Sequence, residues 1–162
     1  MEHHSNPKQA HALMETVMKD HRWIHRCIQH ISVLLGMPDT VLEENARRLQ
    51  KITRCLRMMS RKLYDHFRKE EDGPFLKEFE GFHPQAGARL RHLFREHEEL
   101  RRSIRSILEK AEVLSIATAD PLKNLRQDFF EFVSLLYEHE HLESFLLHSV
   151  QEQHSRKEGK DT

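Results

Sequence analysis

The chain has 162 residues, of which 32% are charged, five are glycine and five are proline. This length suits one domain with a sizeable core, and the scarcity of glycine and proline favours long amphipathic helices over a sheet. The 26 basic and 26 acidic residues balance, so nucleic acid is not expected as a partner. The fourteen histidines are the anomaly, because histidine is the commonest metal ligand in proteins.

Membrane attachment, secretion and disulfide bonding are not expected. No run approaches 18 apolar residues, and residues 1–7 lack the apolar stretch that follows a basic segment in a signal peptide. Cys27 and Cys55 are widely spaced and form no C-x-x-C motif. They are therefore expected to be buried, reduced thiols in a cytoplasmic protein.

The first predicted helix runs from about Gln9 to Leu35 and is stopped by Gly36-Met37-Pro38. Its apolar residues recur at steps of three and four, which is the spacing of a seam, the line of residues that a helix turns toward the bundle interior. His21 occupies a gap in this series, which consists of Leu13, Val17, Ile24, Ile28, Ile31 and Leu35.

The second predicted helix opens with a capping box, Thr40 to Glu43, and ends at about Asp72, before Gly73-Pro74. Its seam ends with a histidine and a glutamate. The seam residues are Leu42, Asn45, Leu49, Ile52, Leu56, Met59, Leu63, His66 and Glu70. Its basic residues are expected to form a solvated face, with a docking surface or dimer contact as the alternative. They are Arg47, Arg48, Lys51, Arg54, Arg57, Arg61 and Lys62.

The third predicted helix runs from about Pro84 to about Leu114, and the fourth starts at Asp120-Pro121, a cap followed by a proline. Both seams are again interrupted by ionisable residues. The third reads Leu90, Leu93, His97, Leu100, Ile104, Ile107, Ala111 and Leu114. The fourth reads Leu122, Leu125, Phe129, Phe132, Leu136, His139, Glu143, Leu146 and Val150.

Four helices that direct histidines and glutamates at one core predict a metal site, because unpaired buried charges cost several kcal/mol each. The alternative is a buried polar network without metal. The predicted ligands are His21, His66, Glu70, His97, His139 and Glu143. This mixed nitrogen and oxygen set suits iron, manganese or zinc. In an antiparallel bundle the turns bring most of these residues to one height, but His21 and His66 require a longer or partly helical connection.

Four segments resemble the hemerythrin-like, or HHE, family, and together they cover most of residues 10–150. They are Asp20-His21-Arg22-Trp23-Ile24, His66-Phe67-Arg68-Lys69-Glu70-Glu71, Glu96-His97-Glu98-Glu99-Leu100-Arg101 and Tyr137-Glu138-His139-Glu140-His141-Leu142-Glu143. The resemblance implies an all-α, up-down antiparallel four-helix bundle that holds two non-haem iron ions. It also implies that Glu70 and Glu143 bridge the irons, which an oxo or hydroxo group can link as well, and that the four histidines cap them.

One departure bears on function. Oxygen-carrying hemerythrins place a second histidine four residues before the one at His97, where this chain has Leu93. This favours redox reactivity or sensing over reversible oxygen carriage. We expect a small oxidant as the partner: dioxygen first, then nitric oxide or peroxide. The chain is expected to be a monomer or weak homo-oligomer. The alternatives are a di-iron enzyme for peroxide or nitric-oxide detoxification or iron donation for repair, and a metal-stabilised regulatory module.

The remaining candidates near the ligands have modest predicted roles. His25 is expected to be a half-exposed flank residue, with a seventh ligand or a partner of a ligand as the alternatives. Tyr64 and Tyr137 are expected to pack at the boundary, with a hydrogen bond to a bound oxygen species as the alternative. Glu71 and Glu140 are expected to be solvated, with orientation of a ligand histidine as the alternative. Residues 1–8 and 153–162 are predicted to be flexible ends around a bundle of residues 9–152.

Overall fold

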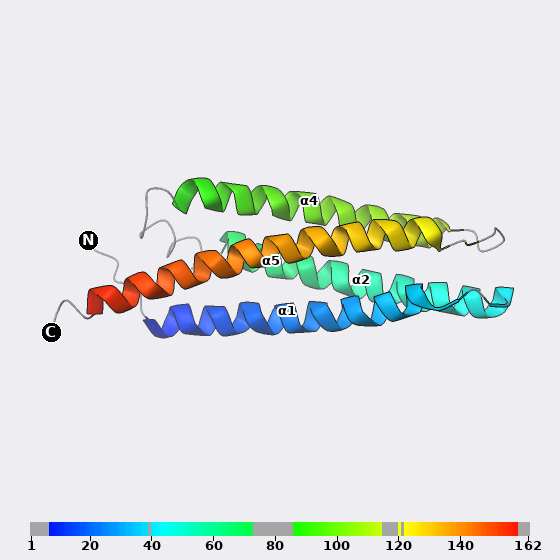
Figure 1. Cartoon of the computed structure of the whole chain (residues 1–162), viewed down its shortest axis with the longest axis horizontal. Helices are drawn as coiled ribbons and strands as arrows, with labels where there is room; N and C mark the ends of the chain where they lie inside the picture. The colour runs from blue at the N-terminus through cyan, green and yellow to red at the C-terminus, as the bar shows by residue number, and fades with distance from the viewer. Residues whose placement is uncertain (1–6, 39, 73–85, 115–119, 121, 159–162) are drawn as a thin grey trace.

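Four long helices form an up-down antiparallel bundle in the described part of the chain (Figure 1). The computed structural model describes residues 7–38, 40–72, 86–114, 120 and 122–158. The helices are α1 (Pro7–Gly36), α2 (Leu42–Asp72), α4 (Ala86–Val113) and α5 (Lys123–Glu158). Each helix packs against its neighbours in chain order, and α5 closes the bundle against α1. The predicted fold class is confirmed.

The helix ends agree closely with the sequence prediction except at the starts of α2 and α5. The α2 helix begins at Leu42, and the backbone nitrogen and hydroxyl of Thr40 donate to Asn45 Oδ1 rather than forming the predicted capping box. Asp120 has a φ of 45°, in the left-handed region that aspartate tolerates, and not the extended conformation of a cap. Its carbonyl accepts a bond from Lys123 that closes a turn before α5.

Several boundary predictions fall on residues that the structure does not describe, namely the stops at Gly73-Pro74 and the starts at Pro84 and Pro121. At the other end of α5 the helix continues to Glu158, beyond the predicted end of the bundle at residue 152. In the described residues no helix is long and apolar enough to cross a membrane.

The connection between α1 and α2 explains how His21 and His66 reach one height. His66 lies 24 residues after Leu42, whereas His21 lies 15 residues before Gly36, so α2 must start nine residues, or about 13 Å, beyond the end of α1. Five extended residues span roughly 16 Å, which is sufficient. The described residues of the 37–41 connection are indeed non-helical, and α2 begins past the end of α1 in Figure 1. Of the two predicted alternatives, a longer or a partly helical connection, the described residues do not show the helical one.

Arginine side chains near the starts of α2 and α5 donate hydrogen bonds to backbone carbonyls at the end of α1 and in the connection that follows it. Arg48 is buried and donates to the carbonyls of Met37 and Pro38 and to Asn45. Arg126 donates to the Leu35 carbonyl. These contacts satisfy carbonyl groups at and just beyond the C-terminus of α1, where a helix leaves them without partners. The prediction that Arg48 belongs to a solvated face is wrong.

The seam residues form the core, and the polar residues divide it. The larger apolar cluster includes Ile24, Ile52, Ile104 and Phe129, and a smaller one consists of Leu90, Leu93 and Leu146. Along α4 and α5 the central histidines and Glu143 lie between these two clusters. The seam prediction fails at Leu42, which is exposed because it starts the turn of α2 that extends beyond the end of α1. Leu49 and Leu114 are only half-buried, but both pack against the larger cluster. Cys27 and Cys55 are free and half-buried.

Candidate metal centre

The six predicted ligands converge from all four helices into one buried cluster, called here the central cluster: His21, His66, Glu70, His97, His139 and Glu143. His21 is 6% exposed and the other five are 2% exposed or less. His66 and Glu70, and likewise His139 and Glu143, are four residues apart, so each pair projects from one face of its helix. Because the donors come from separate helices, the bundle has to form before they meet.

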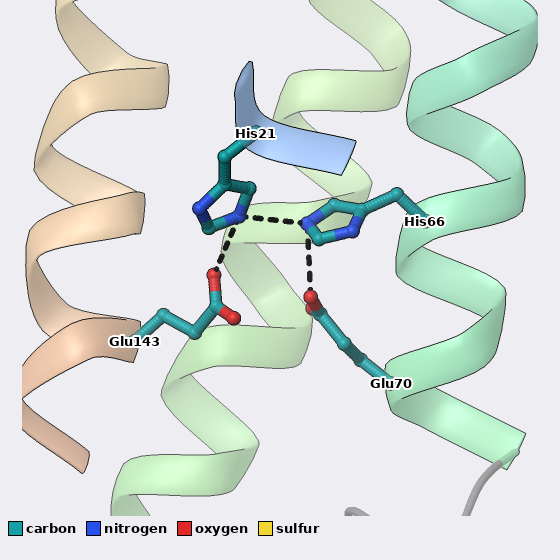
Figure 2. A group of neighbouring side chains, drawn as sticks. All are labelled: His21, His66, Glu70 and Glu143. Atoms are coloured by element: carbon teal, nitrogen blue, oxygen red, sulfur yellow. Dashed lines mark hydrogen bonds and ion pairs between the residues drawn. The ribbon is translucent and has the colours of Figure 1, made fainter. Parts of the chain in front are cut away.

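One group within the central cluster joins α1, α2 and α5 (Figure 2). Nε2 of His21 lies 3.0 Å from Nε2 of His66 and 3.1 Å from Oε2 of Glu143. Nε2 of His66 lies 2.9 Å from Oε1 of Glu70. The four side chains each offer one ligand atom, and these atoms all lie within 4.8 Å of one another. A single metal ion can therefore contact all four.

A second group consists of Glu70, His97 and His139, and it shares Glu70 with the first. Oε2 of Glu70 lies 3.0 Å from Nε2 of His97, while its Oε1 faces His66 in the first group. The two oxygens of one carboxylate thus point at nitrogens of two different groups. This is the arrangement that a carboxylate bridging two metal ions requires.

Six of the eight donor atoms of the central cluster, all except Nε2 of His21 and of His66, make no hydrogen bond. Both oxygens of Glu70, both oxygens of Glu143, and the Nε2 atoms of His97 and His139 are fully buried and have no hydrogen-bond partner. Buried polar atoms are almost always paired, since an unsatisfied one costs about 1–3 kcal/mol. Six such atoms in one place fit a site in which metal ions satisfy them.

The protonation states agree with this interpretation for Glu70 and His139. Burial raises the pKa of Glu70, but the neighbouring His66 and His97 outweigh it and hold the pKa well below its usual range, so the carboxylate is ionised. Burial, together with the positive charge that His97 can carry, lowers the pKa of His139 to about 3. A neutral imidazole and an ionised carboxylate are the forms that bind metal.

His21 and Glu143 differ, because the pKa of each is raised, so the pair favours a bound proton. Burial and the charge of Glu70 raise the pKa of Glu143. Burial lowers the pKa of His21, but its close contact with Glu143 outweighs this effect, and the pKa is raised above its usual value. A metal ion that binds to these two residues must therefore displace this proton.

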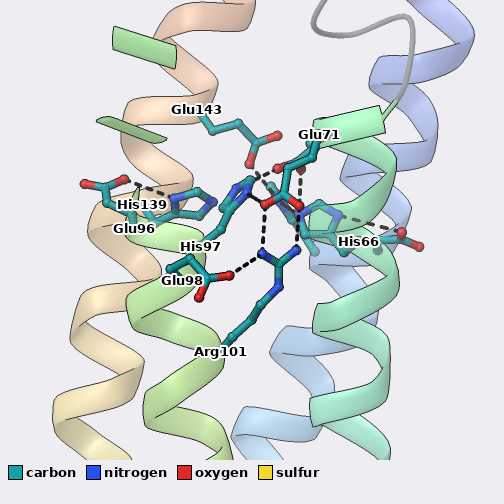
Figure 3. Close-up of polar contacts among 11 residues, drawn as sticks. His66, Glu71, Glu96, His97, Glu98, Arg101, His139 and Glu143 are labelled. Carbon is teal, nitrogen blue, oxygen red and sulfur yellow. Dashed lines mark hydrogen bonds and ion pairs between the residues drawn. The ribbon is translucent and has the colours of Figure 1, made fainter. Parts of the chain in front are cut away.

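Four further carboxylates form a ring around the bundle, called here the carboxylate ring: Asp20, Glu71, Glu96 and Glu140. Each one contacts a histidine on a neighbouring helix of the bundle. Oδ2 of Asp20 lies 3.7 Å from Nδ1 of His66, and the other three contacts are 2.9 Å for Glu71 to His97 Nδ1, 3.1 Å for Glu96 to His139 Nδ1 and 2.6 Å for Glu140 to His25 Nε2. Figure 3 shows Glu71 and Glu96 beside their histidines.

Three members of the carboxylate ring orient histidines of the central cluster, namely His66, His97 and His139. A histidine that interacts with a carboxylate through Nδ1 turns its Nε2 toward the interior. The contact holds the imidazole in place and makes it a more basic metal ligand. The expectation that Glu71 and Glu140 are solvated is wrong, and the roles of Asp20 and Glu96 were missed. The available signal was position: each ring carboxylate is the immediate sequence neighbour of a central-cluster residue.

Cations hold two of these carboxylates in place. Arg101 donates to both oxygens of Glu71, and Lys62 and Lys69 both pair with Asp20. Burial raises the pKa of Asp20, but the two lysines outweigh it and lower the pKa, so the carboxylate stays charged.

Phe67 provides an apolar wall on the α2 side. It is fully buried, stacks on His97 at 4.1 Å between ring centroids and meets His139 edge-on at 5.4 Å. Arg101 lies over its ring and over that of Tyr64. Tyr64 and Tyr137 are thus engaged at the boundary, as predicted, and Tyr137 packs edge-on against the half-exposed His25.

The comparisons with known proteins agree with the site. The family model described as Hemerythrin HHE cation binding domain matches residues 12–150, a span that contains the central cluster and the carboxylate ring. No curated protein and no solved structure matches the chain. The family match and the buried histidine and glutamate cluster together identify a metal-binding bundle. The chain belongs to the hemerythrin HHE cation-binding domain family.

Proposed function

We propose that this protein is a non-haem di-iron protein whose centre binds or reacts with a small oxidant. The observation that carries the proposal is the position of Glu70, whose two oxygens face His66 and His97 in two different ligand groups. A carboxylate in that position would hold two metal ions, one at each oxygen, and would offset their charge. Three imidazoles of the central cluster contact a carboxylate through Nδ1. Such a contact makes the imidazole a more basic ligand, which favours iron in its higher oxidation state.

The two metal positions are unequal. The position nearer His21 has four candidate ligands, whereas the position nearer His97 has three. Neither set completes an octahedron, so both positions retain places for a small ligand, and the second retains more. When bound, ferrous iron at such a position supplies an open coordination site and electrons for dioxygen, nitric oxide or peroxide.

The residues around the centre determine what can reach it. Phe67 and the apolar clusters on either side exclude bulk water from the interior, which favours small neutral oxidants over charged or large molecules. The free thiols Cys27 and Cys55 fit a reducing cytoplasm, where such a centre would sense, store or remove an oxidant. We expect the protein to act as a monomer or a weak homo-oligomer.

Metal analysis of protein produced with added iron tests the assignment. We expect about two irons per chain, as in two-metal sites with a shared carboxylate. Glu70→Ala and His97→Ala should lower the iron content, whereas His141→Ala, which removes an exposed histidine of α5, should leave it unchanged. Protein with no metal, or with one zinc ion per chain, would contradict the di-iron assignment.

Reaction with an oxidant is a separate test. The ferrous protein should change its absorption spectrum when mixed anaerobically with nitric oxide, and on exposure to dioxygen or peroxide. Glu70→Ala should abolish the change. A fully iron-loaded protein that responds to none of the three would retain the metal assignment and refute the oxidant function.

A further inference from the structure

We propose that His25 and Glu140 form a transit site, on the surface between α1 and α5, that captures divalent metal ions and passes them to the central cluster. Nε2 of His25 lies 2.6 Å from Oε2 of Glu140. An imidazole nitrogen and a carboxylate oxygen are the donor types that the central cluster itself uses, and they suit ferrous iron. The inference rests on the proposed metal centre and adds the route by which the metal arrives.

Glu140 differs from the other three members of the carboxylate ring in the histidine that it contacts. Asp20, Glu71 and Glu96 each contact a histidine that belongs to the central cluster, whereas Glu140 contacts His25, which lies outside it. The three other pairs orient metal ligands. The His25–Glu140 pair orients none, so its donor atoms remain available to a metal ion of their own.

Glu140 also has an unused donor atom. Its side chain is only 10% exposed, and its Oε1 is fully buried with no hydrogen-bond partner. Burial of an unpaired carboxylate oxygen is costly, and a cation is the partner that best offsets the cost. The same glutamate therefore presents one oxygen to His25 and a second one without a partner.

The pair connects solvent with the centre. The side chain of His25 is 43% exposed, and its ring is stacked on that of His21 at 6.4 Å between centroids. His21 is in turn the most exposed residue of the central cluster. On α5, Glu140 is one residue from His139 and about one turn from Glu143. A metal ion held by the pair is thus one helical turn from its final ligands.

Two protein ligands are the right number for transit. A site with one imidazole and one carboxylate leaves the remaining positions to water, so it binds weakly and releases the ion to the richer donor set of the central cluster. Tyr137 meets His25 edge-on at 5.3 Å, which limits the rotation of the imidazole. The negative charge of Glu140 behind the half-exposed His25 draws cations in, and such focusing changes association rates by factors of about 10 to 1,000.

Stopped-flow loading of the chelator-stripped full-length protein with Co²⁺ tests this proposal, because the visible bands of Co²⁺ report its coordination. We expect His25→Ala and Glu140→Gln each to slow loading about tenfold. The final metal content and the final spectrum should equal those of the wild type. His30→Ala is the matched control, since it removes an exposed histidine of the same helix, and its loading rate should be unchanged.

Each outcome decides the question. Loading of both variants at the wild-type rate would overturn the transit site. A lower final metal content in His25→Ala would also overturn it, because His25 would then be a ligand of the centre. If the wild-type protein itself takes up no metal, the proposed function fails first and the transit site fails with it. Slow loading to a normal end point supports both.

Discussion

Nδ1 of His97 lies 2.9 Å from Oε1 of Glu71, on the side of the imidazole that faces away from the central cluster. Glu71 comes from α2 and His97 from α4, so the contact joins a predicted ligand on one helix to a carboxylate on another. Arg101 holds the same carboxylate through both of its oxygens. Burial raises the pKa of Glu71, but Arg101 and His97 outweigh it, so the pKa is lowered and the group remains an anion.

Glu71→Gln should weaken metal binding without removing a ligand. The amide is nearly the same size as the carboxylate but carries no charge, so it makes His97 a poorer donor and removes one of the two anions that pair with Arg101. Loss of an outer partner of this kind typically lowers metal affinity by about 10- to 100-fold. Competition of the metal-loaded protein with a chelator of known affinity measures the change.

Glu98→Gln is the matched control for this experiment. Glu98 pairs with the same Arg101 at 3.2 Å, but it is 64% exposed and faces away from the centre. Its replacement should leave metal affinity unchanged. Equal losses of affinity in the two variants would show that Arg101, and not the orientation of His97, is responsible.

Metal affinity should fall as the pH is lowered from neutral. The pKa of His21 is raised above its usual value of about 6.5 by Glu143, although burial opposes the shift. Below that raised pKa the imidazole holds a proton that the metal must displace, and above it no proton competes. Affinity therefore decreases through the neutral range, by about tenfold per pH unit for one displaced proton.

Calorimetric titration in buffers of different ionisation enthalpy counts the released protons directly. We expect proton release at pH 6.5 that diminishes at higher pH. His139 should contribute none, since burial lowers its pKa to about 3 and it is already neutral. An affinity that is constant between neutral and mildly acidic pH would refute the bound proton of His21 and Glu143.

Arg48→Ala should destabilise the bundle while leaving the metal content intact. The side chain is 7% exposed and bonds the carbonyls of Met37 and Pro38 and the amide of Asn45, far along α2 from His66. Loss of these charge-assisted hydrogen bonds should lower the free energy of unfolding by about 2 kcal/mol. Chemical denaturation followed by circular dichroism provides the measurement.

Arg47→Ala is the comparison for Arg48→Ala. Arg47 is 74% exposed and pairs with the exposed Glu43 at 3.8 Å, a contact of the kind that contributes at most about 1 kcal/mol. Its loss should be hardly measurable. If the two variants unfolded at the same denaturant concentration, the fastening of α2 to the end of α1 would have no energetic importance.

The sequence by itself determined the four helices and the six residues of the central cluster. Both follow from local periodicity, because residues three and four apart share one helix face whatever surrounds them. His66 and Glu70 fit the apolar series of α2 as closely as Leu63 does, so their inward direction could be read without knowledge of their partners. The family resemblance rests on the same local segments.

Only the tertiary structure decided which residues stand behind the ligands and how the helices are offset. Asp20, Glu71 and Glu96 are sequence neighbours of central-cluster residues, yet each contacts a histidine on another helix. The sequence does not reveal which side of one helix meets the next helix. The burial of Arg48 and the exposure of Leu42 follow from the start of α2 beyond the end of α1. That offset depends on a connection whose described residues are not helical, and the relative positions of two helices are set by packing and not by periodicity.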